Sequence, residues 1–227
     1  KKITWLSSIN KLKNGPNIFL ANEFFDALPV KQFVKKNNKW FEKKIKMLGD
    51  NKFQFIDVVT NIKKLEKKFK IKFSNNQKII EFSPKTYEYL NIISDKINNF
   101  NGGILIIDYG YLKKKMKNSL QSIHKQKFNY ILNNFGKSDI TYSINFFLLK
   151  KIANNLNLKV EGLTTQRNFL KKLGILHRAE ILAKNLIFSK KADIYYRLKR
   201  LIDKNYMGKL FKVMFLTKKN NKFKVGF

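Results

Sequence analysis

Two carboxylates, Glu23 and Asp26, lie among apolar residues in the stretch ANEFFDALPV, residues 21–30. The stretch follows NIFL, a short apolar run that is typical of a buried strand. Because an unpaired charge is costly to bury, the two carboxylates should be paired, hydrogen-bonded or used to hold a ligand. Paired carboxylates can accept two parallel hydrogen bonds from a guanidinium group. We therefore predict that this stretch forms the mouth of a substrate pocket, with Phe24 and Phe25 as further substrate contacts.

A third carboxylate, Asp108, ends the run GGILIID at residues 102–108. Its four consecutive apolar residues indicate another buried strand, and the glycine pair stops whatever element precedes it. In open α/β sheets, ligands bind outside the carboxyl ends of the strands, and both Glu23 and Asp108 follow an apolar run. We predict that Asp108 lies on the floor of the pocket, with Tyr109 and Tyr111 as its walls.

Both predictions have structural alternatives, which the local pattern leaves open. Acidic residues favour the first turn of a helix, so Glu23 and Asp26 could mark a helix entry after the strand. An aspartate at the end of a strand commonly accepts hydrogen bonds from the backbone of the next loop, so Asp108 could have that role alone.

Apolar periodicity predicts strands and helices in alternation. The expected strands are residues 17–21, a hairpin over 31–48 with an Asn-Asn turn, and residues 52–59, 102–110, 158–165 and 208–218. The expected helices are residues 84–100, which Ser83 caps and Pro84 opens, residues 144–157, and residues 166–204 with an interruption near 173–175. This order predicts an α/β domain with a largely parallel sheet and antiparallel additions.

The chain is expected to form a single domain over residues 1–227. No internal repeat or Pro/Gly/Ser linker divides it. Within the domain, we predict a hairpin and peripheral insertion at residues 31–80, whose polar part is residues 60–78, and a helical insert at residues 166–204.

Several other polar residues are interpreted as structural. Glu81 and Ser83 indicate a helix entry, Asp139 and Thr141 a cap before the helix that follows, and Gln166 a helix start. The Phe-rich segment 128–136 is expected to pack in the core or a lid. The only histidines, His124 and His177, have no cysteine or acidic pattern around them, so we predict neither a metal site nor a histidine-based nucleophile.

The net charge of +33 suggests a nucleic-acid partner, but the composition argues against a specific one. Only four of the 48 basic residues are arginines, the residue that phosphate and base-edge recognition favours, and the lysines are spread over the whole length. Abundant Lys, Asn, Ile and Phe share A/T-rich codons, which explains the charge as surface drift. Weak, salt-sensitive association with polyanions is still expected.

The sequence also limits the location of the protein. No apolar run approaches the roughly 20 residues that a membrane span needs, and the first residues lack the apolar region of a secretory signal. The chain has no cysteine, which fits a reducing compartment.

Six motifs, taken together, resemble the MidA family of S-adenosylmethionine-dependent methyltransferases. They are ANEFFDALPV, EFSP, GGILIIDYGY, SDITYSINF, TTQRNFLKKLGI and MGKLFKVMFLT, in this order, and the resemblance covers residues 5–227. It implies the C-terminal part of a class I, Rossmann-like methyltransferase fold. It also implies S-adenosylmethionine as cofactor and methyl transfer to a protein arginine nitrogen by direct in-line displacement.

The resemblance further implies roles and partners. Other protein arginine methyltransferases place acidic residues just after the corresponding strand, which makes Glu23 the stronger and Asp26 the weaker catalytic candidate, with Asp108 in support. Mitochondrial members of the family are complex I assembly factors that methylate an arginine of a core NADH dehydrogenase subunit. Such a subunit is therefore the implied protein substrate, and a bacterial cytoplasm is the implied location, with the mitochondrial matrix as the alternative. For the assembly, we consider a homodimer.

One departure from the family concerns the cofactor. Family members carry a glycine-rich loop and an acidic ribose-binding residue upstream of NEFFDALP, and this chain has neither. Its one close glycine pair, Gly102-Gly103, precedes a strand, whereas a cofactor loop follows a strand and opens a helix. We expect most cofactor contacts in an N-terminal part absent from this chain, with Asn22 as the candidate within it.

Other functions stay open at this point. The main alternative is a noncatalytic assembly or binding module, or a basic protein that binds polyanions. A fold shared by many methyltransferases does not fix the acceptor, so a small molecule or an RNA base is a third alternative.

Overall fold

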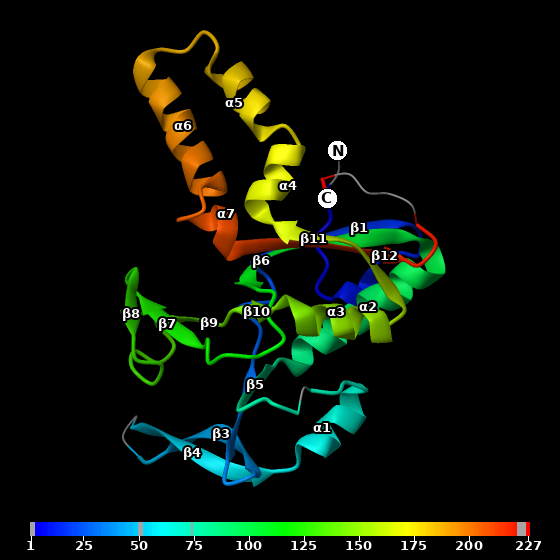
Figure 1. Cartoon of the computed structure of the whole chain (residues 1–227), viewed down its shortest axis with the longest axis vertical. Helices are drawn as coiled ribbons and strands as arrows, with labels where there is room; N and C mark the ends of the chain where they lie inside the picture. The colour runs from blue at the N-terminus through cyan, green and yellow to red at the C-terminus, as the bar shows by residue number, and fades with distance from the viewer. Residues whose placement is uncertain (1–2, 50–51, 74, 222–225) are drawn as a thin grey trace.

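The computed structural model describes residues 3–49, 52–73, 75–221 and 226–227 (Figure 1). Three sheets and a set of helices make up this part of the chain. In chain order the elements are η1 (Ile9–Lys11), β1 (Asn17–Asn22), β2 (Lys31–Lys36), β3 (Lys39–Met47), β4 (Phe53–Thr60), α1 (Ile62–Phe69), β5 (Ile79–Phe82), α2 (Pro84–Phe100), β6 (Gly102–Tyr111), β7 (Gln121–His124), β8 (Lys127–Asn129), β9 (Asp139–Thr141), β10 (Ile144–Asn145), α3 (Phe146–Asn155), β11 (Leu158–Thr165), α4 (Gln166–Lys172), α5 (Ile175–Ala183), α6 (Phe188–Ile202), α7 (Met207–Leu210) and β12 (Phe211–Lys218).

The central sheet has the order β1-β6-β12-β11, and β10 pairs with the end of β6. Strands β1 and β10 run parallel to β6, but β12 runs antiparallel to both β6 and β11. The prediction of a largely parallel sheet was therefore wrong, and the sheet is mixed. The reason is the connection between β11 and β12. Helix α4 begins where β11 ends, and α7 leads directly into β12, so the helical segment returns the chain to the end of the sheet that it left. Strand β12 must therefore run antiparallel to β11.

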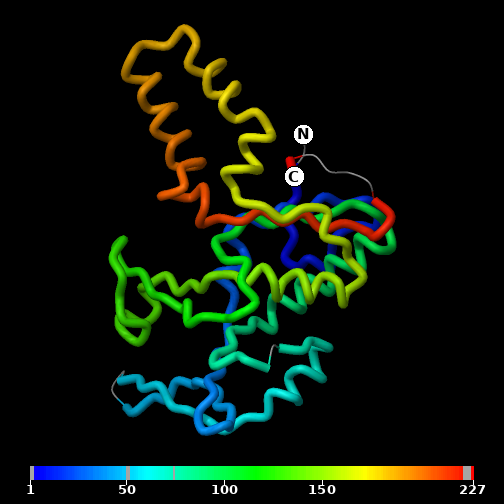
Figure 2. Tube along the Cα trace, viewed as in Figure 1, coloured from blue at the N-terminus to red at the C-terminus, as the bar shows by residue number. Residues whose placement is uncertain are grey.

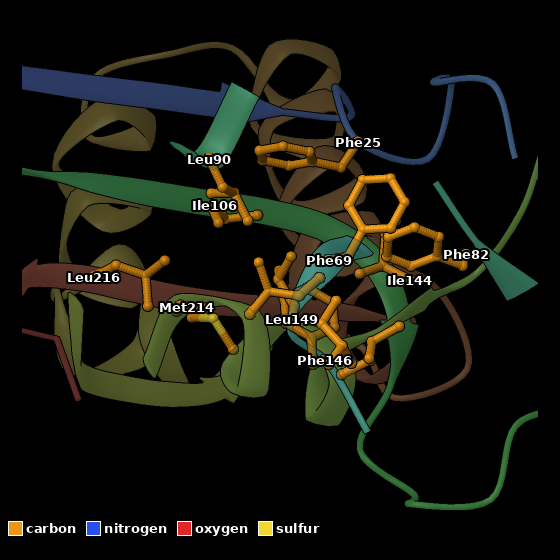
Figure 3. Close-up of a cluster of buried hydrophobic side chains, with 14 of the residues drawn as sticks. Phe25, Phe69, Phe82, Leu90, Ile106, Ile144, Phe146, Leu149, Met214 and Leu216 are labelled. Atoms are coloured by element: carbon orange, nitrogen blue, oxygen red, sulfur yellow. The ribbon is translucent and has the colours of Figure 1, made fainter. Parts of the chain in front are cut away.

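Helices α2 and α3 cover one face of this sheet (Figure 1). Ser83 caps α2 by accepting a hydrogen bond from the Thr86 N–H, and Pro84 takes the first helical position, as predicted. The predicted apolar stripe is buried at Leu90, Ile93 and Ile97. These side chains meet those of β6 and β12 in the main core, which Figure 3 shows around Ile106, Leu149 and Met214.

The glycine pair that begins β6 allows a close approach to β1. Gly102 has φ +108°, and a Cβ atom there would stand 1.9 Å from the Asn17 carbonyl oxygen. A Cβ at Gly103 would stand 2.9 Å from the Leu216 carbonyl oxygen of β12. Any side chain at Gly102 would therefore push β1 and β6 apart.

A four-stranded antiparallel sheet, β4-β3-β2-β5, lies beyond the carboxyl ends of β1 and β6 (Figure 1). The predicted hairpin forms β2 and β3, and its turn residues Asn37 and Asn38 have φ values of 45° and 59°. The prediction that residues 60–78 are only peripheral was wrong. This segment contains α1, and Ile62, Phe69, Ile71 and Phe73 are part of the core because α1 buries its apolar face against β5 and α2.

A three-stranded sheet, β8-β7-β9, connects β6 to β10. Asp139 and Thr141 are in strand β9, so the prediction that they cap the next helix was wrong, and the Asn145 side chain caps α3 instead. The Phe-rich segment was expected to pack in the core or a lid, but Phe128 and Phe135 are exposed, so neither packs in the core. The Phe135 ring stacks on that of Phe53, with ring centroids 4.8 Å apart.

The helical insert forms an arm that projects away from the central sheet (Figure 2). Helices α4, α5 and α6 fall within the predicted range, and the interruption at residues 173–175 is confirmed. Residues 208–210, expected to begin the last strand, belong to the short helix α7. None of the helices in the described ranges is both long and apolar enough to cross a bilayer.

Candidate functional site

The loop after β1 turns sharply at Glu23. This residue has φ 47°, in the left-handed region that few non-glycine residues adopt. Its N–H still donates to the Ile107 carbonyl oxygen at 2.9 Å, which fixes the loop to β6. No helix follows within residues 23–30, so the helix-entry alternative for Glu23 and Asp26 was wrong. The Glu23 side chain is exposed at the carboxyl edge of the sheet.

Asp108 holds this loop in place. One carboxylate oxygen accepts hydrogen bonds from the N–H groups of Phe25 at 3.0 Å and Asp26 at 3.3 Å. The other accepts from the N–H of Tyr109 at 2.9 Å. The loop-capping role proposed for Asp108 is therefore confirmed. Its side chain is fully buried at 0% exposure, so it holds the loop from within the core and has no surface with which to contact a ligand.

The three carboxyl groups interact electrostatically. Burial, and then the charge of Asp26, raises the pKa of Asp108 to about 7, against the backbone hydrogen bonds that lower it. Asp26 is 7% exposed, and its pKa is raised by burial and then by the charge of Glu23. The structure thus brings Glu23, Asp26 and Asp108 together, and the exposure of the side chain decreases in that order. The sequence predicted that Glu23 and Asp108 lie at the same end of the sheet.

Tyr109 lies beside the carboxyl groups. Its hydroxyl accepts a hydrogen bond from the Gln121 side chain and also bonds Thr141 and Ser143. Burial, above all, raises its pKa, and the charges of Asp26 and Asp108 add to the effect. No pattern in the sequence indicates Gln121, because its contact with Tyr109 joins β7 of the three-stranded sheet to β6.

The other predicted pocket residues have different environments. Phe25 is a core side chain with 0% exposure, so it has no surface with which to contact a ligand. Phe24 is partly exposed and packs edge-on against Phe25 and Tyr89, with ring centroids 5.1 Å apart in each case. The Tyr111 hydroxyl accepts from the Lys117 N–H at 3.4 Å, and burial raises its pKa.

Glu81 is a strand residue of β5, so its assignment to a helix entry was wrong. Its carboxylate accepts from the Gln32 side chain at 2.8 Å, the Ser119 N–H at 2.9 Å and the Leu120 N–H at 3.1 Å. Ser119 also bonds it through its hydroxyl, which in turn accepts from the Ser143 N–H at 3.0 Å. Glu81 therefore fixes the segment that carries Gln121 and Ser143 to the neighbouring sheet.

In the described part of the chain, none of the three edge carboxyl groups forms an ion pair with a lysine or arginine, despite the excess of lysine. Nor do the described ranges hold a cluster of His, Asp and Glu able to bind a metal ion. Of the three carboxyl groups, only that of Glu23 is exposed to solvent.

The glycine pair Gly102-Gly103 lies between neighbouring strands. Gly102 and Gly103 are packed against Asn17 and Leu216, so the glycine pair serves strand packing instead of opening a loop around a ligand. Asn22, the candidate cofactor contact, is exposed at the end of β1 with its side-chain amide 3.5 Å from Glu23 Oε1.

The mixed sheet with helices on its face defines an α/β protein whose carboxylates gather at one strand edge. A family model described as "Putative S-adenosyl-L-methionine-dependent methyltransferase" matches residues 1–164. The chain belongs to this family of methyltransferases, the MidA family.

Curated relatives agree. The chain is 29% identical over 209 residues to the protein arginine methyltransferase NDUFAF7, mitochondrial, of Danio rerio. The match covers 92% of this chain and 49% of the relative. It is 31% identical over 180 residues to the mitochondrial NDUFAF7 homologue of Caenorhabditis elegans. This match covers 78% of this chain and 42% of that protein. The chain thus spans about half the length of these relatives.

A solved structure shares the fold. It is a COG1565 superfamily member from Burkholderia thailandensis bound to S-adenosyl-homocysteine, with a TM-score of 0.81 and 18% sequence identity. The match covers 99% of this chain and 58% of that one.

Proposed function

We propose that this chain is the acceptor-binding part of a protein arginine methyltransferase that uses S-adenosylmethionine. The observation that carries the proposal is the row of carboxyl groups Glu23, Asp26 and Asp108 at the carboxyl edge of β1 and β6, none of them ion-paired in the described residues. Membership of the family and the printed names of the relatives support it. The fold is accordingly assigned as the C-terminal part of a class I methyltransferase.

Each carboxyl group has a distinct task in this proposal. Glu23, exposed and turned at the loop, holds the guanidinium of the substrate by charge-assisted hydrogen bonds. Asp26 accepts the proton that the arginine nitrogen loses as it gains a methyl group, and its raised pKa makes it a better acceptor than an ordinary carboxylate. Asp108 orients both through the N–H groups of Phe25 and Asp26.

The surrounding residues shape the pocket. Tyr109 and Tyr111 form its walls, and Phe24 supplies an apolar contact at its mouth. Phe25 supports the loop from the core. When bound, S-adenosylmethionine supplies the methyl group, and Asn22 is the residue of this chain proposed to face it.

Product analysis tests the proposal. A version of the protein that spans the length of its relatives should transfer a methyl group to arginine in an acceptor protein, so mass spectrometry should find a gain of one methyl mass on arginine. Methyl groups found only on other side chains, on RNA or on small molecules would replace arginine as the acceptor.

The cofactor gives a separate prediction. Because the glycine pair is used for strand packing, the 227-residue chain alone should bind S-adenosylmethionine poorly, whereas the family-length version should bind it. Titration calorimetry on both proteins measures the difference. Micromolar binding by the shorter chain would contradict the assignment of the cofactor site to residues outside it.

We propose a protein partner of the kind that the relatives' family implies, a subunit of NADH dehydrogenase during complex I assembly. We propose that the protein is located in a bacterial cytoplasm or, in line with the relatives' mitochondrial names, in the mitochondrial matrix.

We also propose a homodimer. It is supported by the arm, at whose tip the Phe188 ring is 86% exposed next to the exposed Ile187.

A further inference from the structure

Lys212, the second residue of β12, is a buried lysine at the same sheet edge as the carboxyl groups. It is 8% exposed, and every other lysine side chain in the described ranges is more accessible. It lies directly opposite Asp108 in the β6–β12 register. Surface drift, which explains exposed lysines, does not explain a lysine in this position, because a buried ammonium group is costly.

Two more lysines gather around it. Burial first, and then the charges of Lys209 and Lys117, lower the pKa of Lys212, so each of these two ammonium groups acts on that of Lys212. Lys117 Nζ lies 5.1 Å from the centre of the Tyr111 ring at the end of β6. None of the three forms an ion pair with a carboxylate within the described residues.

A structural role accounts for only part of this arrangement. Lys212 Nζ donates to the carbonyl oxygens of Lys209 and, at 3.0 Å, Leu210, so it caps the end of the short helix α7. An ammonium group has three protons, and the third has no acceptor among the described residues. Capping α7 would also not need the added positive charge of Lys117 and Lys209.

We propose that Lys117, Lys209 and Lys212 form an anion subsite that binds an acidic side chain of the protein substrate near its target arginine. This inference rests on the proposed function, and it specifies the class of substrate. The edge is polarised: carboxylates lie toward β1 and ammonium groups toward β12, which are the two neighbours of β6. Paired residues on adjacent strands lie about 5 Å apart, and an extended peptide rises about 3.3 Å per residue. The acidic residue is therefore within a few positions of the arginine.

Three fluorescent peptides, titrated into the chain at about 0.15 M salt, test the subsite. The first has an arginine with a glutamate two residues away, the second replaces this glutamate by glutamine, and the third replaces the arginine by citrulline. The parent chain should bind the glutamate peptide about tenfold more tightly than the glutamine peptide, as one charge-assisted hydrogen bond would provide.

Lys212→Met should reduce this preference to less than about twofold and keep the preference for arginine over citrulline. Methionine preserves the length and the apolar stem of the side chain, and a melting curve checks the fold. If Lys212→Met fails to fold, the exposed Lys117→Met should lower the preference instead. The control is Lys199→Met on α6, which makes the same change in net charge at an exposed position and should keep the tenfold preference.

A parent chain without preference for glutamate would overturn the subsite. So would a preference that Lys212→Met leaves intact or that Lys199→Met removes equally. If the parent chain shows no preference for arginine over citrulline, the result counts against the proposed function. The comparison of the glutamate peptide with the glutamine peptide still tests the anion subsite by itself.

Discussion

Glu23→Gln should lower kcat/KM for arginine methylation by roughly thirty-fold to several thousand-fold, the equivalent of about 2–5 kcal/mol. Glutamine keeps the shape and part of the hydrogen bonding but removes the charge that holds the guanidinium. The melting temperature should hardly change, because the side chain is exposed and the left-handed backbone at φ 47° is common to both variants. Steady-state kinetics and melting of the family-length protein measure both quantities.

Glu180→Gln is the matched control, since it makes the same change at an exposed position on α5, far along the arm. It should leave both activity and melting unchanged. Normal turnover of Glu23→Gln with a lowered melting point would mean that the carboxylate stabilises the loop and does not act on the substrate.

Asp108→Asn should lower kcat/KM by about a hundredfold, because the loop that carries Glu23 and Asp26 loses its charged acceptor and small displacements in a site have costs of this order. The parent activity should also rise with pH through about 7, as Asp108 ionises, and the variant should lack this rise. A pH profile of kcat/KM for both proteins, with the exposed Asp95→Asn as control, measures the effect.

The stability of the same pair has a defined pH trend. The pKa of Asp108 is raised from 3.8 to about 7 in the fold, so the folded protein binds this proton more tightly than the unfolded chain. The stability of the parent relative to Asp108→Asn should therefore fall as the pH rises from about 4 to about 7, and be level outside that window. A difference that increases over this range would contradict a buried, raised-pKa carboxyl group.

Local patterns in the sequence were enough to place strands β1 and β6 and the carboxylates Glu23 and Asp108. Apolar runs predicted that β1 and β6 are strands, because an apolar run is a property of consecutive residues. The prediction that β1 is buried was wrong for one of its faces, where Ile18 is 77% and Leu20 69% exposed, and Asp108 lies within β6 and not at its end. The Ser83-Pro84 helix start was predictable for the same reason.

Features that depend on contacts between distant segments were not predictable in this way. The direction of β12 is set by the helical excursion before it, and its own apolar pattern reads the same in either direction. Glu81 was assigned to a helix entry because Ser83 and Pro84 follow it, whereas its partners Ser119 and Leu120 come from a separate segment. Likewise, nothing near Gln121 in the sequence indicates that it bonds Tyr109.

The central claim is that the carboxyl groups at this sheet edge recognise a guanidinium group. The most direct measurement is the ratio of dissociation constants of the parent chain for an arginine peptide and its citrulline counterpart, which has nearly the same shape without the charge. We expect the arginine peptide to bind at least about tenfold more tightly, and Glu23→Gln to bring the ratio close to one. Equal affinity of the parent for the two peptides would contradict the claim.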